Sequence, residues 1–315
     1  MRILFFGTPE FAVPPLRALI GEGHDVVAVV TQPDRPQGRS RSTLVPSPVK
    51  VVALEEGIPV LQPDRPRGEE FLGTLRALAP DLAVVVAYGH ILRQDLIDLP
   101  RLGTLNIHAS LLPRWRGAAP IQAAMLAGDA ETGVCIMRMV LGLDAGPVLL
   151  ALRTGIDPQE TAGELTERLS ELGAEAIVEA VTLLEAGESG AAGETPQDEA
   201  LVTYAPKIER AMARLDFTRP AAEVARAIHA FDPKPGAWGL LRDGEVRLYG
   251  ARVLPDRRGD AGEVLAVDEG GLVVACGTGA VAVEAVHPAG KRRLAALDWA
   301  QGRGVAVGDR WALPA

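Results

Sequence analysis

The stretch "GTLNIHASLLPRWRGAAPI" at residues 103–121 joins an apolar strand to a loop and then to a helix. "TLNIHA" is typical of a buried strand, yet it carries an amide and an imidazole, Asn106 and His108. Side chains two positions apart on a strand lie on the same face of the sheet. The following loop holds two arginines around a tryptophan, and an apolar helix pattern begins at Ala119. This unit predicts a layered α/β fold in which one strand end is functional.

The same alternation of strand and helix continues on both sides of this unit. Apolar strands are predicted at residues 2–6, 25–31 and 81–88, helix patterns follow Gly7 and Ser47, and a long helix is predicted at 161–186. Strands alternating with helices indicate a Rossmann-like, doubly wound and mostly parallel sheet. The sequence therefore predicts an α/β domain at residues 1–186.

The rest of the chain has a different pattern. Residues 187–207 are aperiodic and rich in Gly, Ala and Glu, which predicts a linker. Residues 208–315 contain one helix pattern and then short strands at tight spacing. That pattern predicts a small OB-like β-barrel as the C-terminal domain.

Composition limits the class of protein. Hydrophobic residues make up 48% of the 315 residues, which is typical of a globular chain. The only two cysteines, Cys135 and Cys276, lie in apolar runs without metal-ligand spacing, so we expect reduced thiols, no bound metal and a cytoplasmic location. The apolar run at residues 2–6 is too short for a signal peptide, and no run reaches the length of a membrane span, so no membrane partner is expected.

The charge is acidic overall but locally basic. A net charge of -9 argues against a simple nucleic-acid binder. Residues 33–50, however, carry four basic side chains against one acidic side chain, Asp34. This basic insertion is either a solvated loop or a contact surface for a polyanion, and charge alone leaves both open.

The turn after the first strand is where a nucleotide-binding motif would be expected. It reads Gly7-Thr8-Pro9-Glu10 and lacks the G-x-G-x-x-G spacing that brings backbone close to a pyrophosphate. The chain also lacks the G-x-x-x-x-G-K motif of phosphate-binding loops. Both nucleotide-cofactor classes are therefore excluded.

Polar groups follow three of the predicted strands. An open parallel sheet binds its ligand at the carboxyl ends of its strands, and the informative ends are 86–89, 106–108 and 139–144. Asn106 can donate to a developing oxyanion, His108 can move a proton, and Asp144 can orient the imidazole. No Ser or Cys has the context of a nucleophile elbow, so a substrate nucleophile would attack directly. A single His at a strand end or an Asp in a turn is common in proteins of many functions. These residues alone therefore predict no more than an acyl-type transferase.

The motifs resemble one family closely. "NIHASLLPRWRGAAPI" resembles the N-x-H-x-S-L-L-P-x-x-R-G signature of the formyltransferases that use 10-formyltetrahydrofolate, and "LDAG" at 143–146 is similar to their second signature. "FFGTPEFA", "TQPDRPQGR", "PSPVK" and "PAGKRRL" are similar to segments of the members that act on methionyl-tRNA. The resemblance implies a Rossmann-like domain followed by an OB-like domain. It also implies transfer of the formyl group from 10-formyltetrahydrofolate to the amino group of methionine on initiator tRNA.

The resemblance also implies roles for individual residues. Asn106, His108 and Asp144 fall on the catalytic positions of the family. The positions implied for folate contact are Ser110, Leu111, Leu112, Pro113, Ala87, Tyr88 and Gly89. The positions expected to contact tRNA are Arg39, Arg41, Arg35, Lys50 and Arg114. A monomer is expected.

Two other functions compete with this interpretation. A related formyltransferase acting on a small amine would share the site, but it would need neither the basic insertion nor the C-terminal barrel. A non-catalytic tRNA-binding protein would be expected to show clustered aromatic side chains in its barrel. Four are present, Trp238, Tyr249, Trp299 and Trp311, without obvious clustering in the sequence.

Overall fold

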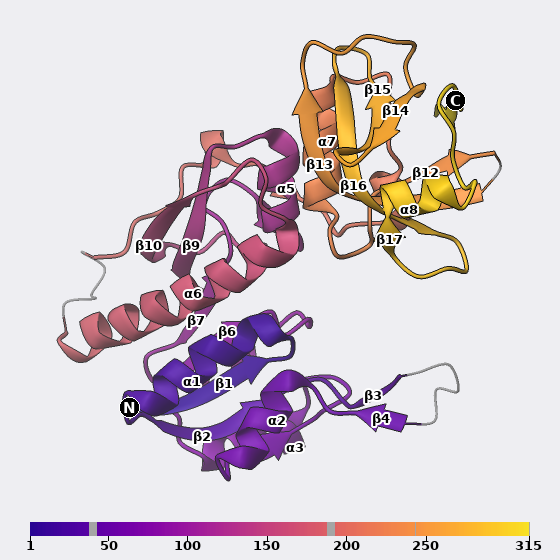
Figure 1. Cartoon of the computed structure of the whole chain (residues 1–315). Helices are drawn as coiled ribbons and strands as arrows, with labels where there is room; N and C mark the ends of the chain where they lie inside the picture. Colours follow the sequence, from indigo (N-terminus) through magenta and orange to yellow (C-terminus); the bar gives the residue numbers. More distant parts are fainter. Residues whose placement is uncertain (38–42, 188–192, 243, 315) are drawn as a thin grey trace. The chain divides into compact units, whose positions relative to one another are not determined.

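The computed structural model describes residues 1–37, 43–187, 193–242 and 244–314. The chain forms two compact units (Figure 1). The N-terminal unit comprises Met1–Gly117, Thr132–Thr154 and Thr166–Tyr204, and the C-terminal unit comprises Ala118–Glu131, Gly155–Leu165 and Ala205–Ala315. Each unit is described by itself below.

The N-terminal unit is built on a seven-stranded sheet in the order β10-β9-β7-β6-β1-β2-β5. Five neighbouring strands of this sheet are parallel. They are β1 (Arg2–Gly7), β2 (Asp25–Val30), β5 (Val60–Leu61), β6 (Leu82–Val86) and β7 (Thr104–His108). The remaining two are β9 (Glu131–Arg138) and β10 (Val148–Gly155). The predicted parallel-dominated α/β sheet is confirmed.

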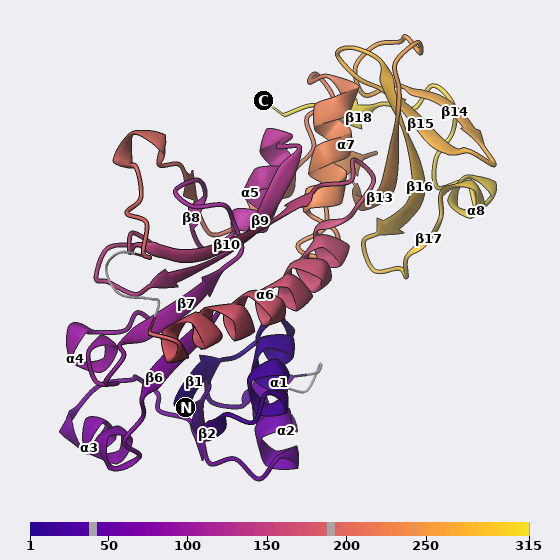
Figure 2. The ribbon, with the colours of Figure 1, turned by 90° about the vertical axis from the view of Figure 1, so that its left-hand side faces the viewer.

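Helices cover both faces of this sheet because its strands are apolar on both sides (Figure 2). Helices α1 (Val13–Gly21), α2 (Pro48–Glu55) and α6 (Ala162–Glu185) cover one face, and α3 (Glu69–Ala77) and α4 (Gln94–Ile97) cover the other. Leu4 and Phe6 pack with leucines of α3 and α4. Ile3 and Phe5, which alternate with them along β1, are also fully buried.

The direction of one strand, β9, differs from the expectation. β9 pairs with β7 in the antiparallel sense, with His108 opposite Cys135 and Leu105 opposite Arg138. The carboxyl end of β9 therefore lies beside the amino end of β7. We expected Asp144 to follow a parallel strand and so to lie at the carboxyl edge shared by the parallel strands. That expectation is wrong. Asp144 belongs to the loop of residues 139–147 between β9 and β10.

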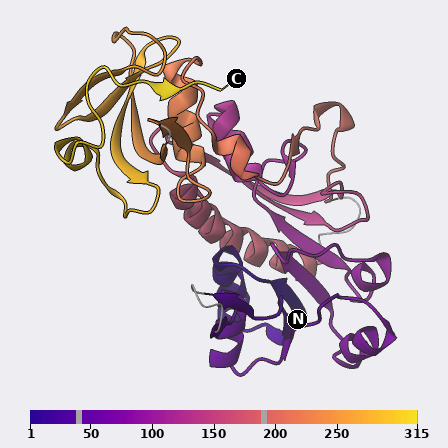
Figure 3. The same cartoon turned by 90° about the vertical axis from the view of Figure 1, so that its right-hand side faces the viewer.

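The C-terminal unit is an antiparallel β structure with helix α7 (Ala221–Ala230) packed on it (Figures 1 and 3). Its strands are β12 (Trp238–Leu241), β13 (Gly244–Leu254), β14 (Val264–Asp268), β15 (Gly271–Ala275), β16 (Ala280–Pro288), β17 (Leu294–Ala295) and β18 (Trp311–Ala312). β18 pairs with β12, and the Trp311 N–H also donates to the Gly262 carbonyl at 2.9 Å. This second contact joins the two outer edges of the sheet, as the predicted barrel requires.

Shorter helices complete the C-terminal unit. α5 (Pro120–Ala127) packs on α7, and α8 (Ala296–Gln301) packs on β16. None of the helices in the described part of the chain combines the length and apolar character that crossing a bilayer requires.

Candidate active site

Three strand ends meet at the carboxyl edge of the parallel strands. Gly7 at the end of β1 is paired with Val86 at the end of β6, and Asn106 of β7 is paired with Val85 of β6. The structure therefore brings the turn of residues 87–89 and the end of β7 to one edge, as predicted. Asn106 is half-buried, and His108, on the same face, is buried.

His108 has a polar group near each ring nitrogen, but only the one at Nε2 is within hydrogen-bond distance. Its side chain is buried, with the residue 6% exposed. Nε2 lies 2.9 Å from the carbonyl oxygen of Trp115, and because a carbonyl only accepts, Nε2 carries the hydrogen of this bond. Nδ1 lies 3.8 Å from Oδ2 of Asp144. That separation is an ion-pair distance for a protonated ring but is too long for a hydrogen bond.

Asp144 reaches His108 because its loop folds back from the far end of β9. Its Oδ2 accepts a hydrogen bond of 2.8 Å from the N–H of Gly117. The Asp144 backbone has a φ of 46°, in the left-handed region that non-glycine residues adopt at a cost of about 1–3 kcal/mol. The contacts around the loop must offset that cost.

The turn at residues 87–89 has a constrained backbone. Ala87 and Gly89 have φ values of 46° and 85°. The Tyr88 carbonyl accepts from Thr8 Oγ1 at 3.1 Å and from Gln32 Nε2 at 3.0 Å. The positive φ favours glycine at position 89, and a Cβ added there would also displace the Gln32 amide, whose Nε2 would lie 2.4 Å away.

The Tyr88 side chain is buried behind this turn. Its ring packs edge-on against Phe6, with centroids 5.4 Å apart. Burial raises the pKa of Tyr88 to about 12, so the side chain is a neutral phenol at physiological pH. Within the described residues its hydroxyl is buried without a hydrogen-bond partner.

Residues 110–113 form a compact turn after β7. Ser110 Oγ donates to the Arg114 carbonyl at 2.7 Å, and the Leu112 N–H donates to Cys135 Sγ at 3.4 Å. The Leu112–Pro113 peptide is cis. Burial raises the pKa of Cys135 to about 11, so this thiol is a structural acceptor and not a nucleophile.

The basic insertion is described at its base only. β3 (Arg35–Gln37) and β4 (Thr43–Val45) pair as a hairpin, and the predicted tRNA contacts Arg39 and Arg41 lie outside the described residues. Arg35 is exposed and donates to the side chain of Gln32. Arg114 is exposed, and its guanidinium lies 5.0 Å from the ring centroid of Trp115.

Lys50 is engaged within the chain. Its side chain is 19% exposed, and Nζ lies 2.7 Å from Asp34 Oδ2 and 2.8 Å from Gln62 Oε1. Gln62 Nε2 donates to Asp34 Oδ1 at 2.8 Å. The hydrogen bond from Lys50 holds the pKa of Asp34 below its usual value, so the Asp34 carboxylate is ionised at neutral pH. Asp34 and Lys50 thus tie together the two ends of the insertion.

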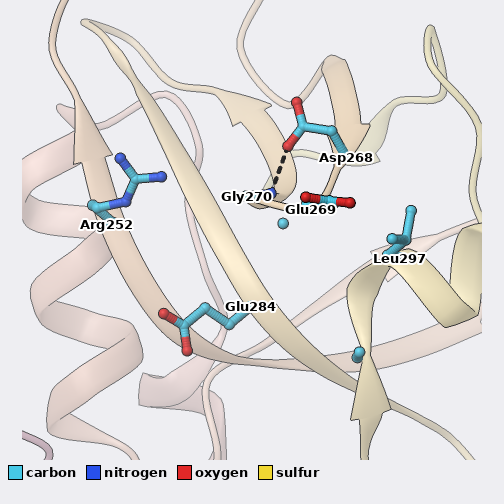
Figure 4. A pocket seen from close by; sticks show the side chains of 8 residues that line it. Arg252, Asp268, Glu269, Gly270, Glu284 and Leu297 are labelled. Atoms are coloured by element: carbon cyan, nitrogen blue, oxygen red, sulfur yellow. Dashed lines mark hydrogen bonds between the residues drawn. The ribbon is translucent and has the colours of Figure 1, made fainter.

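A pocket lies elsewhere, in the C-terminal unit (Figure 4). It has a volume of about 350 Å³ and is lined by charged side chains that include Arg252, Asp268, Glu269 and Glu284. None of the predicted site residues that the structure describes lines it. Across residues 1–37, 43–187, 193–242 and 244–314, no group of three or more His, Cys, Asp or Glu side chains could hold a metal ion.

Sequence reasoning missed several residues that support the site. Gln197 and Thr203 lie in the predicted linker, yet they hydrogen-bond to the Asp144 loop and to Trp115. Arg116, read only as a basic loop residue, is buried. The pairing of Arg116 with Glu199 depends on tertiary structure, so the local sequence carried no signal for it.

Comparison with known proteins identifies relatives over nearly the whole chain. Residues 1–181 match the family described as formyl transferase, and residues 207–304 match the formyl transferase C-terminal domain. The methionyl-tRNA formyltransferase of Xanthomonas campestris is 52% identical over 304 residues, covering 96% of this chain and 98% of the relative. That of Dechloromonas aromatica is 49% identical over 100% of both chains.

Solved structures show the same fold at low sequence identity. HypX from Aquifex aeolicus in complex with tetrahydrofolic acid has a TM-score of 0.64 and 21% identity, covering 95% of this chain and 46% of HypX. WlaRD, a sugar 3N-formyl transferase, has a TM-score of 0.67 and 16% identity, covering 93% of this chain and 99% of WlaRD.

Proposed function

This chain belongs to the formyl transferase family, together with the methionyl-tRNA formyltransferases, and we propose that Asn106, His108 and Asp144 carry out its reaction. The enzyme transfers the formyl group of 10-formyltetrahydrofolate to the amino group of methionine on initiator methionyl-tRNA, giving N-formylmethionyl-tRNA for translation initiation. The predicted activity and co-substrate are thereby confirmed at the level of the family.

The proposed chemistry follows the charges that develop during transfer. The methionyl nitrogen attacks the formyl carbon, and the formyl oxygen becomes negatively charged until the bond to the folate nitrogen breaks. Asn106 donates to that oxygen, a contribution that is largest in the transition state. The amine loses a proton and the leaving folate nitrogen gains one.

His108 is the group that carries this proton. Its Nε2 is committed to the Trp115 carbonyl, so Nδ1, near Asp144, is the nitrogen that we assign to proton transfer. The carboxylate of Asp144 stabilises the ring while it is charged. The approach of Asp144 to His108 at 3.8 Å, between segments distant in sequence, is the observation that carries the proposal.

The remaining assignments are also proposals. Ser110, Leu111, Leu112, Pro113 and the turn Ala87–Tyr88–Gly89 contact the folate, because both segments lie at the same strand edge as His108. Arg39, Arg41 and Arg35 of the insertion and Arg114 of the loop after β7 contact tRNA, and Lys50 supports the insertion from its base.

The organisation of the enzyme completes the proposal. Residues 1–186 form the catalytic domain, 187–207 join it to residues 208–315, and that last segment adds tRNA contacts. We also propose that the enzyme acts as a monomer, which a site supplied by one chain allows. A cytoplasmic location fits its tRNA substrate and its two free, buried thiols.

A substrate comparison tests the proposed function. The purified enzyme is given 10-formyltetrahydrofolate with charged initiator methionyl-tRNA, charged elongator methionyl-tRNA or an amino-sugar nucleotide. We expect formylation of initiator methionyl-tRNA to be the fastest by a wide margin. Faster formylation of the small amine would contradict the proposal.

A further inference from the structure

The segment of residues 194–204 is part of the N-terminal unit, and we call it the strap. It is attached along its length. Glu194 Oε1 accepts from Arg138 Nε at 2.8 Å, and Thr195 exchanges two backbone hydrogen bonds with Val148, of 2.8 and 2.9 Å. The strap therefore follows the start of β10, directly beside the loop that carries Asp144.

Gln197 of the strap holds the Asp144 loop through both hydrogens of its amide. Nε2 donates to the carbonyl of Asp144 at 2.8 Å and to the carbonyl of Gly146 at 2.7 Å. Oε1 accepts from Arg116 Nε at 2.9 Å. Because a side-chain amide has two donors and an acceptor, this one group links the loop to Arg116.

Arg116 continues the link to the Asp144 carboxylate. It is 3% exposed, and its guanidinium also donates to Glu199 of the strap at 2.9 Å. The next residue, Gly117, donates its N–H to Asp144 Oδ2. The Asp144 loop is thus held at its backbone by Gln197 and at its carboxylate by Gly117.

Thr203 at the other end of the strap supports His108 indirectly. Its Oγ1 accepts from the Trp115 N–H at 2.9 Å, and its carbonyl accepts from the Arg116 N–H at 2.9 Å. Trp115 has a φ of 62°, and its carbonyl receives the hydrogen bond from His108. The strap therefore fixes the peptide on which the imidazole rests.

Beyond Met139, which packs against the core, apolar packing does little to hold the Asp144 loop. Leu141 and Leu143 are 68% and 60% exposed. Asp144 is also in a left-handed conformation, so the loop depends on its hydrogen bonds. A displacement of about 1 Å in a catalytic group can lower a rate by about 10²-fold.

We propose that Gln197 and Thr203 are positioning residues that hold Asp144 and His108 in their reactive arrangement. This inference rests on the proposed catalytic role of those two residues. The strap ends at Tyr204, and the chain enters the C-terminal unit at the next residue, Ala205.

Two substitutions of Gln197 separate positioning from general packing. Gln197→Glu keeps an acceptor for Arg116 but replaces the donor to the two loop carbonyls with an oxygen. Gln197→Met removes all the polar contacts. We expect both variants to lose about 10–100-fold in kcat, with KM for folate and for tRNA within about 3-fold of wild type. Gln159→Met, at an exposed glutamine, is the matched control and should be unchanged.

A conservative pair tests Thr203. Thr203→Val removes the hydroxyl that accepts from Trp115, and Thr203→Ser restores it. We expect Thr203→Val to lose about 3–10-fold in kcat and Thr203→Ser to recover it. Thermal melting of every variant shows whether the fold is intact.

The decisive experiment is a double-mutant cycle with Asp144→Asn. If Gln197 acts through Asp144, Gln197→Glu should cost less than about 3-fold in the Asp144→Asn background. A wild-type kcat for folded Gln197→Glu, or an undiminished loss in the double mutant, would overturn the inference. A wild-type kcat for Asp144→Asn would instead contradict the proposed catalytic role itself, so the two failures are distinguishable.

Discussion

Two polar networks of the N-terminal unit differ in how completely they are satisfied. At the base of the insertion, both carboxylate oxygens of Asp34 accept hydrogen bonds, from Lys50 and Gln62. At the end of β7, Nε2 of His108 is bonded, but Nδ1 lies 3.8 Å from Asp144, beyond hydrogen-bond distance. We call the Asp34 network saturated because both carboxylate oxygens are hydrogen-bonded, and such a network fixes the backbone at the base of the insertion. A network that holds one titratable atom close to a carboxylate without bonding it provides a group that can exchange a proton.

The largest expected difference between the networks is in turnover. Asn106→Ala and Asp144→Asn should each lower kcat by about 10²–10³-fold, because their interactions strengthen in the transition state. Lys50→Met, in the saturated network, should change kcat by less than about 5-fold. Steady-state kinetics on folded variants measures both effects. Equal losses at the two networks would remove the distinction.

The insertion should affect tRNA affinity instead of chemistry. Replacing Arg39 and Arg41 by Ala should raise KM for charged tRNA several-fold, leave KM for folate unchanged, and reduce the salt slope of tRNA binding by roughly one to two units. Arg76→Ala, at an exposed arginine on α3, is the control. An unchanged tRNA KM and salt slope in the double variant would mean that the insertion is only a solvated loop.

The smallest expected effect is on stability at the saturated network. The pKa of Asp34 is lowered in the folded protein, so the pair stabilises the fold above the unfolded carboxyl pKa of about 3.9 and ceases to do so as pH falls through the folded value. Asp34→Asn should lower Tm at pH 7 by no more than a few degrees. The difference from wild type should shrink as pH falls below about 4 and vanish below the folded pKa of Asp34. A difference that stays constant from pH 7 to well below pH 4 would contradict the ionic origin.

The sequence predicted the parts of the site that local patterns encode. The end of β7 was found because a polar pair on an apolar strand is unusual, and its motif resembles a family signature. The antiparallel direction of β9 was not predicted, because an apolar run does not encode its partner's orientation. The motif drew attention to Asp144, but the expectation that it follows a parallel strand was wrong.

The supporting contacts could not be predicted. Gln197 is a single polar residue in aperiodic text, and its partners lie more than 50 residues away in the chain. The pairing of Asp34 with Lys50 depends on a hairpin whose register the sequence did not define. Both require tertiary structure, because they join segments that share no periodic pattern.

The most direct test of the catalytic assignment is the single-turnover rate of His108→Ala. The variant is mixed with saturating 10-formyltetrahydrofolate and charged initiator methionyl-tRNA, after binding of each substrate has been measured separately. The proton-transfer role predicts wild-type binding and a rate at least about 10²-fold below wild type. A folded His108→Ala enzyme that binds both substrates and formylates at close to the wild-type rate would contradict the assignment.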